Sequence, residues 1–276
     1  MSKTFERQAT GLVREVSAFR AFVLNLMFTS PAFMLIFLVL GQGLFPGAYL
    51  PISSLLALIP ALIVAFVYAQ LSVAYPRSGG DYVFIGRILH PSVGFMVNFV
   101  FTLINISVIG TEAVWITSMA LGPMFNALAA ISNNPGLAGL ASTLTVPVNE
   151  FIVGALIAIV LPFVMYFGAS VSFKLKTFFF VVSAFSILTF LVAMAVTSNA
   201  NFVSNFDSLS TTSYSQTIAA AQNAGVRFSY NFGDTLLGVV YTILAVYGFT
   251  ASTYIGGEVK NPQRSQTIGM VVAPVV

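Results

Sequence analysis

The fold is decided by the stretch Ala21–Pro76, which reads AFVLNLMFTSPAFMLIFLVLGQGLFPGAYLPISSLLALIPALIVAFVYAQLSVAYP and contains 56 residues without one Asp, Glu, Lys or Arg. A membrane-spanning helix needs about 20 apolar residues, so this stretch can hold two spans. Further uncharged runs occupy residues 91–111, 113–149, 151–173, 177–206 and 235–257. These runs lack the alternation of a membrane β-barrel strand. The sequence therefore predicts an all-α, polytopic membrane protein.

The composition excludes most other classes. Of 276 residues, 58% are hydrophobic and 7% are charged, whereas an average soluble domain carries about 25% charged residues. This excludes a soluble globular domain, a disordered chain and a fibrous repeat. Cysteine is absent and His90 is the only histidine. Disulfides, thiolate metal sites and most nucleophile–base pairs are therefore excluded, and we expect no enzyme, no bound metal and no cofactor other than a coupling ion.

Six spans are expected, at about residues 20–45, 53–75, 91–121, 150–169, 175–198 and 235–256. The predicted organisation is an N-terminal cytoplasmic segment (1–19), a first five-helix repeat (20–198), an extracellular loop with a short interfacial helix (199–234, helix 216–222), and the start of a second repeat that stops inside a seventh helix (235–276).

The basic residues give the orientation. With the N-terminus inside, ten of the eleven lysines and arginines lie on the inner side and only Arg227 lies outside. We therefore predict a multi-pass protein of the plasma membrane with a cytoplasmic N-terminus. The net charge of +3 needs no nucleic-acid partner, because the basic residues are distributed as topology signals. The oligomeric state is not indicated.

The first span is interrupted by Pro31. The proline removes a backbone donor and disfavours helical geometry at Ser30, while the hydroxyls of Thr29 and Ser30 can bond freed carbonyls. One interpretation is a proline kink with hydroxyls bonded back to the helix, which is common in membrane proteins. The other is an unwound segment that lines a cavity.

The sixth span is rich in small residues. Gly248 is followed within six residues by Thr250, Ala251, Ser252 and Thr253. Such a stretch unwinds easily, although it can also be a face for close helix packing. Interruptions at corresponding positions of two inverted repeats mark the binding site of a transporter, where helix N-termini face an anion and free carbonyls face a cation.

Two loop motifs carry a family resemblance. Residues 68–82 read YAQLSVAYPRSGGDY and residues 257–264 read GEVKNPQR. Both resemble inner-loop signatures of the amino acid–polyamine–organocation (APC) superfamily of permeases, "AELSSAFPRSGGDYVY" and "EVKNPQRNIP". The motif residues are Pro76, Arg77, Ser78, Gly79, Gly80, Asp81, Glu258, Asn261, Pro262 and Arg264. The resemblance covers the whole chain but only the first half of a typical family member.

A physical interpretation of these motifs stands beside the resemblance. Gly79 and Gly80 permit a tight turn, and Asp81 can cap the following helix. Glu258 and Arg264 can form ion pairs in the inner gate. The alternative is that these are topology charges at helix ends, which accounts for residues such as Arg87, Lys174 and Lys176.

The resemblance implies a LeuT-type inverted-repeat fold that works by alternating access in the lipid bilayer, on substrates with an amino and a carboxyl group. By position, the substrate carboxylate would meet amides of Thr29, Ser30, Pro31 and Ala32. The ammonium would meet carbonyls near Phe28 and around Tyr247, Gly248, Phe249 and Thr250. The chain departs from the family where Thr-Ser-Pro replaces Gly-Ser-Gly and where Thr250 replaces a glutamate. The proline donates no N–H, so one family contact is lost or shifted.

The resemblance leads us to expect coupling to H⁺ or Na⁺. A lysine in span five replaces the sodium site in some proton-coupled relatives, and that position falls near Ser183. Its hydroxyl can ligate Na⁺ or merely bond its own helix. Glu112 is the one carboxylate well inside a span, and such a residue is a functional hypothesis by default. The alternative is a structural carboxyl wetted at the end of a long helix.

The predicted function is thus secondary active transport of amino acids or related amines. A channel is a competing interpretation, although no filter repeat such as TVGYG is present. A truncated or half-length protein with an accessory or regulatory role is the other. The downstream coding sequence would separate these, because a transporter should continue with about five more spans.

Overall fold

The computed structural model describes residues 14–245 and 248–276. Within these residues all regular elements are helices, and the one β-bridge joins Val16 to Val259. The chain divides into two compact units, Met1–Gly94 with Lys176–Val276, and Phe95–Leu175. We describe each unit by itself.

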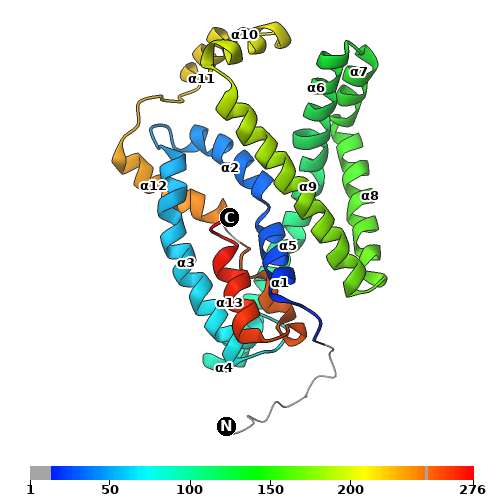
Figure 1. Ribbon diagram of the computed structural model, residues 1–276, viewed down its shortest axis with the longest axis vertical. Coiled ribbons are helices and arrows are strands. Elements are labelled where there is room, and N and C mark those ends of the chain that lie inside the picture. The colour runs from blue at the N-terminus through cyan, green and yellow to red at the C-terminus, as the bar shows by residue number, and fades with distance from the viewer. Residues whose placement is uncertain (1–13, 246–247) are drawn as a thin grey trace. The chain divides into compact units, whose positions relative to one another are not determined.

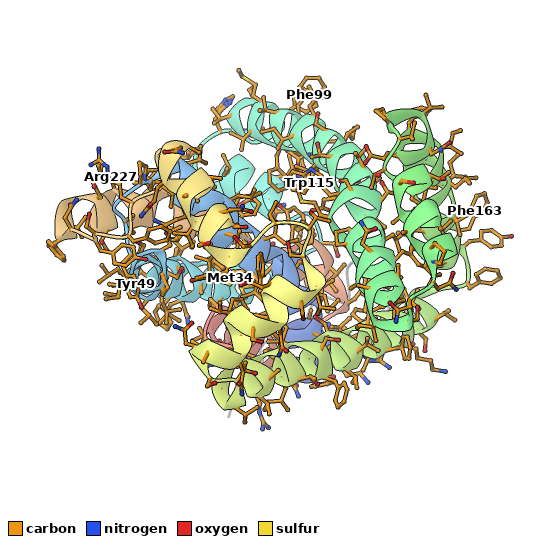
Figure 2. All side chains as sticks on the ribbon, turned by 90° about the horizontal axis from the view of Figure 1, so that it is seen from above. Met34, Tyr49, Phe99, Trp115, Phe163 and Arg227 are labelled. Atoms are coloured by element: carbon orange, nitrogen blue, oxygen red, sulfur yellow. The ribbon has the colours of Figure 1, made fainter. Side chains whose placement is uncertain are left out.

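The helices confirm the membrane prediction. In the described part of the chain, five stretches are long and apolar enough to cross a membrane: Ala18–Leu44, Leu50–Ala74, Pro91–Ser132, Pro147–Val164 and Ser170–Val196. A sixth apolar helix, Phe232–Leu244, is shorter. Large apolar side chains on these helices face outward: Phe163 is 63% exposed and points away from its helix (Figure 2). The protein is therefore a multi-pass membrane protein.

The first unit is built around one long helix with a face of small residues. Helix α3 (Leu50–Ala74) packs against α12 (Phe232–Ala245) and α13 (Pro262–Val272), and α13 also packs against α1 (Ala18–Thr29) (Figure 1). The buried residues of α3 beyond Leu50 are all small: Ser53, Ala57, Ala61, Ala65, Ala69 and Ser72. Small side chains at helical spacing let helices approach closely in a membrane.

The second unit contains helices that extend beyond the expected third span. After α5 (Pro91–Trp115), a π-helical segment η1 (Ile116–Leu121) leads into α6 (Gly122–Ser132), and the chain turns back through α7 (Pro135–Leu144) into α8 (Pro147–Tyr166). A Cβ added to Gly154 would lie 3.1–3.2 Å from atoms of Ala113, so α8 and α5 pack closely. The helical stretch Pro91–Ser132 is thus longer than the expected span 91–121.

The segment expected as one long loop is mostly helical. After α9 (Ala169–Val196), α10 (Asn199–Leu209) and α11 (Tyr214–Asn223) precede α12. The predicted helix 216–222 lies within α11, whereas α10 was not predicted. Side-chain caps explain both starts: Ser198 accepts from Asn201 N, and Ser213 forms a capping box with Gln216.

Candidate functional site

The first interruption separates α1 from α2 (Pro31–Leu44) at Ser30. Ser30 adopts a left-handed conformation with φ 53° and ψ 84°. Its N–H still closes the last turn of α1 on Leu26 O at 2.9 Å, and its carbonyl accepts from Met34 N at 3.1 Å. The Thr29 hydroxyl donates back to Asn25 O at 3.0 Å. The helix is thus broken at Ser30 rather than only kinked.

The second interruption follows α12 and centres on Gly248. Its φ of +111° favours glycine, because side chains clash in this region. The chain then turns through Thr250 into a 3₁₀ helix, η2 (Ala251–Glu258), with Ala251 N donating to Gly248 O at 3.0 Å. Tyr247, another predicted site residue, lies outside the described residues.

The structure brings the two interruptions into contact. A Cβ added to Gly248 would lie 2.6 Å from Phe28 Cδ1 and 3.1 Å from both Phe28 C and Thr29 N. The backbones of the interrupted helices therefore touch, with no room for a side chain between them. Phe249 is buried in the core beside Leu26, whereas Thr250 is half-buried.

A buried polar cluster next to this contact was missed by the sequence analysis. Asn25 Oδ1 accepts from Ser252 N at 2.7 Å. The Ser252 hydroxyl donates to Gln266 Oε1 at 2.6 Å, and Gln266 Nε2 donates to Ser252 O at 3.1 Å. All three side chains are at most 1% exposed. The cluster joins α1, η2 and α13, and an amide side chain inside an apolar run was the signal available in the sequence.

Two atoms in this unit remain without a partner. Asn25 Nδ2 and Ser72 Oγ are buried and form no hydrogen bond within the described residues. The orientation of the Asn25 amide is fixed, because a flipped amide would place Nδ2 against the Ser252 N–H, donor facing donor.

The predicted inner-loop motif lies against η2. Gly79 N donates to Tyr254 O at 3.2 Å, and Gly257 N donates to the Ser78 hydroxyl at 3.3 Å. A Cβ at Gly80 would lie 2.7 Å from the Tyr254 ring, and one at Gly256 would lie 2.8 Å from the carbonyl oxygen of Arg77. The glycines of both segments are therefore needed for this close packing as well as for the turn.

Asp81 does not cap its helix as predicted. Helix α4 (Asp81–Ile88) begins at Asp81 itself, its N-cap is Gly80, and no side chain caps it. The carboxylate instead accepts hydrogen bonds from the hydroxyls of Tyr68, on α3, and Tyr254, on η2, the latter at 2.9 Å. The acid is satisfied by two phenols that lie 13 and 173 residues away in sequence.

The second motif is joined to the N-terminal segment by backbone hydrogen bonds. Val16 N donates to Glu258 O at 3.0 Å, and Lys260 N donates to Val16 O at 2.8 Å, which forms the parallel bridge. No ion pair joins Glu258 to Arg264 in the described structure, where Glu258 is half-buried and Arg264 is exposed. Here the motif is held by backbone bonds rather than by its charges.

The other motif residues lie close to these contacts. Pro76 and Arg77 are exposed in the loop after α3. Asn261 has a φ of +45° immediately before α13, and Pro262 occupies the first position of that helix, where a missing N–H costs nothing.

The two residues considered for ion coupling differ in exposure. Ser183 is half-buried on α9, and Glu112 is exposed on α5. Among the described residues, no group of three or more His, Asp or Glu side chains is arranged to hold a metal ion.

Comparison with known proteins identifies relatives. The family model described as "Amino acid permease" matches residues 33–276. The cation-chloride cotransporter 2 of Oryza sativa subsp. japonica is 26% identical over 219 residues, which cover 72% of this chain and 22% of the relative. The chain therefore spans about a fifth of that relative's length. No solved structure matches the chain.

Proposed function

The chain belongs to the amino acid permease family, and we propose that it forms part of a secondary active transporter that moves amino acids or related amines by alternating access. Family membership and the apolar helices support membrane transport in a lipid bilayer. The substrate class, the mechanism, the plasma-membrane location and the cytoplasmic N-terminus are parts of the proposal.

The single observation that carries the proposal is the contact between the two interrupted helices. Where a helix begins, its first N–H groups have no partner within the helix and attract an anion. Where a helix ends, its free carbonyls attract a cation. At Ser30 one helix ends and another begins, and Gly248 lies against the same point. A zwitterionic amino acid has both complementary charges.

The predicted substrate residues take defined parts in this proposal. Of the amides predicted for the carboxylate, that of Ala32 at the start of α2 would meet it, because Pro31 donates no N–H and the Ser30 N–H is bonded to Leu26 O. Carbonyls near Phe28 and around Tyr247–Thr250 would face the ammonium. The proposed larger fold is a LeuT-type pair of inverted repeats, of which the chain supplies the first repeat and the start of the second.

Alternating access requires an inner side that closes and opens. In this proposal the bonds between residues 78–81 and η2, together with the Val16–Val259 bridge, hold the inner side closed. Ser183 and Glu112 are the candidates for Na⁺ and H⁺ coupling respectively. Sodium prefers oxygen ligands, and an ionisable side chain within a span can carry a proton.

A second candidate function has one supporting observation. The relative from Oryza sativa subsp. japonica carries the name of a cation-chloride cotransporter. The hydroxyls of Thr29, Ser30 and Thr250 are oxygen ligands of the kind that an alkali cation prefers. We therefore include inorganic ions among the substrates to be tested.

The test is uptake by the complete protein, purified and reconstituted in phospholipid vesicles. Labelled amino acids, decarboxylated amines, rubidium and chloride are offered under a sodium gradient, a pH gradient or neither. Saturable, gradient-driven uptake of an amino acid or amine supports the proposal. Gradient-driven uptake of rubidium and chloride alone favours the second candidate. Flux that rises linearly with concentration indicates a channel, and no flux at all favours an accessory role.

Coupling is resolved by two variants in the same assay. Glu112→Gln should abolish stimulation by a pH gradient if H⁺ is the coupling ion, and Ser183→Ala should abolish stimulation by sodium if Na⁺ is. Ser186→Ala is the matched control for the second, since its hydroxyl donates to Val182 O on the same helix. Uptake that keeps its full gradient dependence in both variants would remove both residues from the coupling site.

A further inference from the structure

The helical hairpin α10–α11 carries an apolar face that the transport proposal does not use. Phe202, Phe206 and Leu209 lie at spacings of four and three residues and so share one side of α10. Phe202 is 40% exposed and Leu209 is 60% exposed. Together with Asn205 and Ser210 these side chains line a shallow groove. Polar residues, among them Ser204, occupy the opposite side of the helix.

The hairpin is held in shape by its own contacts. The rings of Phe202 and Phe206 meet the ring of Tyr214 edge-on, at centroid distances of 6.1 and 6.0 Å. Asp207 Oδ1 accepts from Tyr214 N at 2.6 Å across the turn. The only charge of residues 199–223 therefore ties the two helices together.

The chain connections keep the hairpin close to the end of a long apolar helix. The span in α9 ends at Val196, and α10 begins at Asn199. Three residues reach at most about 10 Å, and the headgroup layer on each side of the hydrocarbon core is roughly 5–8 Å thick. Figure 1 shows α10 running across the end of α9 rather than continuing its axis. The segment then returns to the apolar helix α12 at Phe232.

We propose that α10 lies in the plane of the membrane surface, with Phe202, Phe206 and Leu209 inserted at the boundary between headgroups and acyl chains. The partner is phospholipid. Aromatic and aliphatic side chains on one face of a short helix have this preference. Because residues 199–223 contain no lysine or arginine, insertion depends on apolar contact and not on anionic lipids. The position of α10 in the membrane surface does not depend on which molecule the protein transports.

The chain has a single tryptophan, Trp115, which makes the test direct. In a Trp115→Phe background of the complete protein, Leu209→Trp and Ser204→Trp place one reporter on the apolar face and one on the opposite face. The protein is reconstituted in phosphatidylcholine vesicles whose acyl chains are brominated close to the headgroup. Bromine quenches tryptophan only at short range, whereas aqueous iodide quenches tryptophan that is open to water.

We expect at least twofold stronger quenching by bromine for Leu209→Trp than for Ser204→Trp, the reverse order for iodide, and no change between low and high salt. If iodide quenches both reporters equally and bromine neither, the hairpin lies in water. If neither agent reaches Leu209→Trp, another part of the protein covers this face. Either result overturns the proposal. Phe202→Trp provides a second reporter on the same face should Leu209→Trp fail to fold.

Discussion

Replacing Gly248 with alanine should separate the two interrupted helices. The new Cβ would lie 2.6 Å from Phe28 Cδ1 and 3.1 Å from the backbone of Phe28 and Thr29. The ring can rotate away from the first contact, but the backbone contacts remain unless the helices move. A non-glycine residue at φ +111° also costs about 1–3 kcal/mol in strain, and overpacking adds about 1–3 kcal/mol. The expected loss is about 2–6 kcal/mol, a large part of the 5–15 kcal/mol typical of a folded domain.

Gly43→Ala is the matched control. Gly43 lies inside α2, and an added Cβ would meet nothing within 4 Å. Alanine there should stabilise the helix by about 0.5–1 kcal/mol. The assays are the thermal unfolding midpoint of detergent-purified protein and uptake in vesicles. Gly248→Ala should lower the midpoint and abolish uptake, while Gly43→Ala should raise the midpoint slightly and leave uptake unchanged. Normal uptake by Gly248→Ala would refute the reasoning, because the close contact would then not be required.

Three further predictions follow from single contacts and are measured as unfolding free energies or thiol reactivity. Ser30→Gly should stabilise the protein by about 1 kcal/mol, because glycine adopts φ +53° without steric cost; an unchanged or lower midpoint contradicts the strain. Ser72→Ala removes a buried hydroxyl that has no partner, so it should leave the unfolding free energy unchanged or raise it. Asn25→Ala leaves the Ser252 N–H unpaired and should lower the unfolding free energy by about 1–3 kcal/mol. Equal effects of the two variants would contradict the hydrogen bond from Ser252 N to Asn25 Oδ1. Tyr254→Phe removes one donor to Asp81 and should loosen the contact between η2 and residues 78–81. Thr253 is 1% exposed and the chain has no cysteine, so Thr253→Cys should react faster with a water-soluble maleimide when it is combined with Tyr254→Phe than when it is alone. An unchanged rate would argue that this hydrogen bond does not hold the inner side closed.

The membrane helices were predictable because charge is expensive in the bilayer. The gaps between charged residues gave all five long spans and the shorter sixth. Helix ends were less predictable, since they depend on local caps. Helix α6 continues past the expected end at residue 121, and α10 starts after the Ser198 cap in a segment that looked like a polar loop.

The interruptions could be predicted, but their surroundings could not. Pro31 and Gly248 carry backbone constraints that act on their own neighbours, so the sequence shows them directly. The bond from Ser252 N to Asn25 Oδ1 joins residues 227 positions apart, and no local pattern indicates it. The partners of the Asp81 carboxylate were mispredicted for a similar reason. Asp81 was expected at a helix cap and is paired with two tyrosine hydroxyls, whose identity as donors depends on the packing of α3 and η2.

The departure from the family pattern at the first interruption has a physical resolution. Thr-Ser-Pro replaces Gly-Ser-Gly, which on sequence grounds removes one amide from the proposed carboxylate site. The structure places Pro31 at the first position of α2, where the N–H would have no partner within the helix and the fixed φ of proline favours helix initiation. The next amides, beginning with Ala32, retain the direction and partial charge of a helix start. A proposed site built from backbone can therefore tolerate this substitution, and discrimination among substrates must come from side chains that surround the interruption.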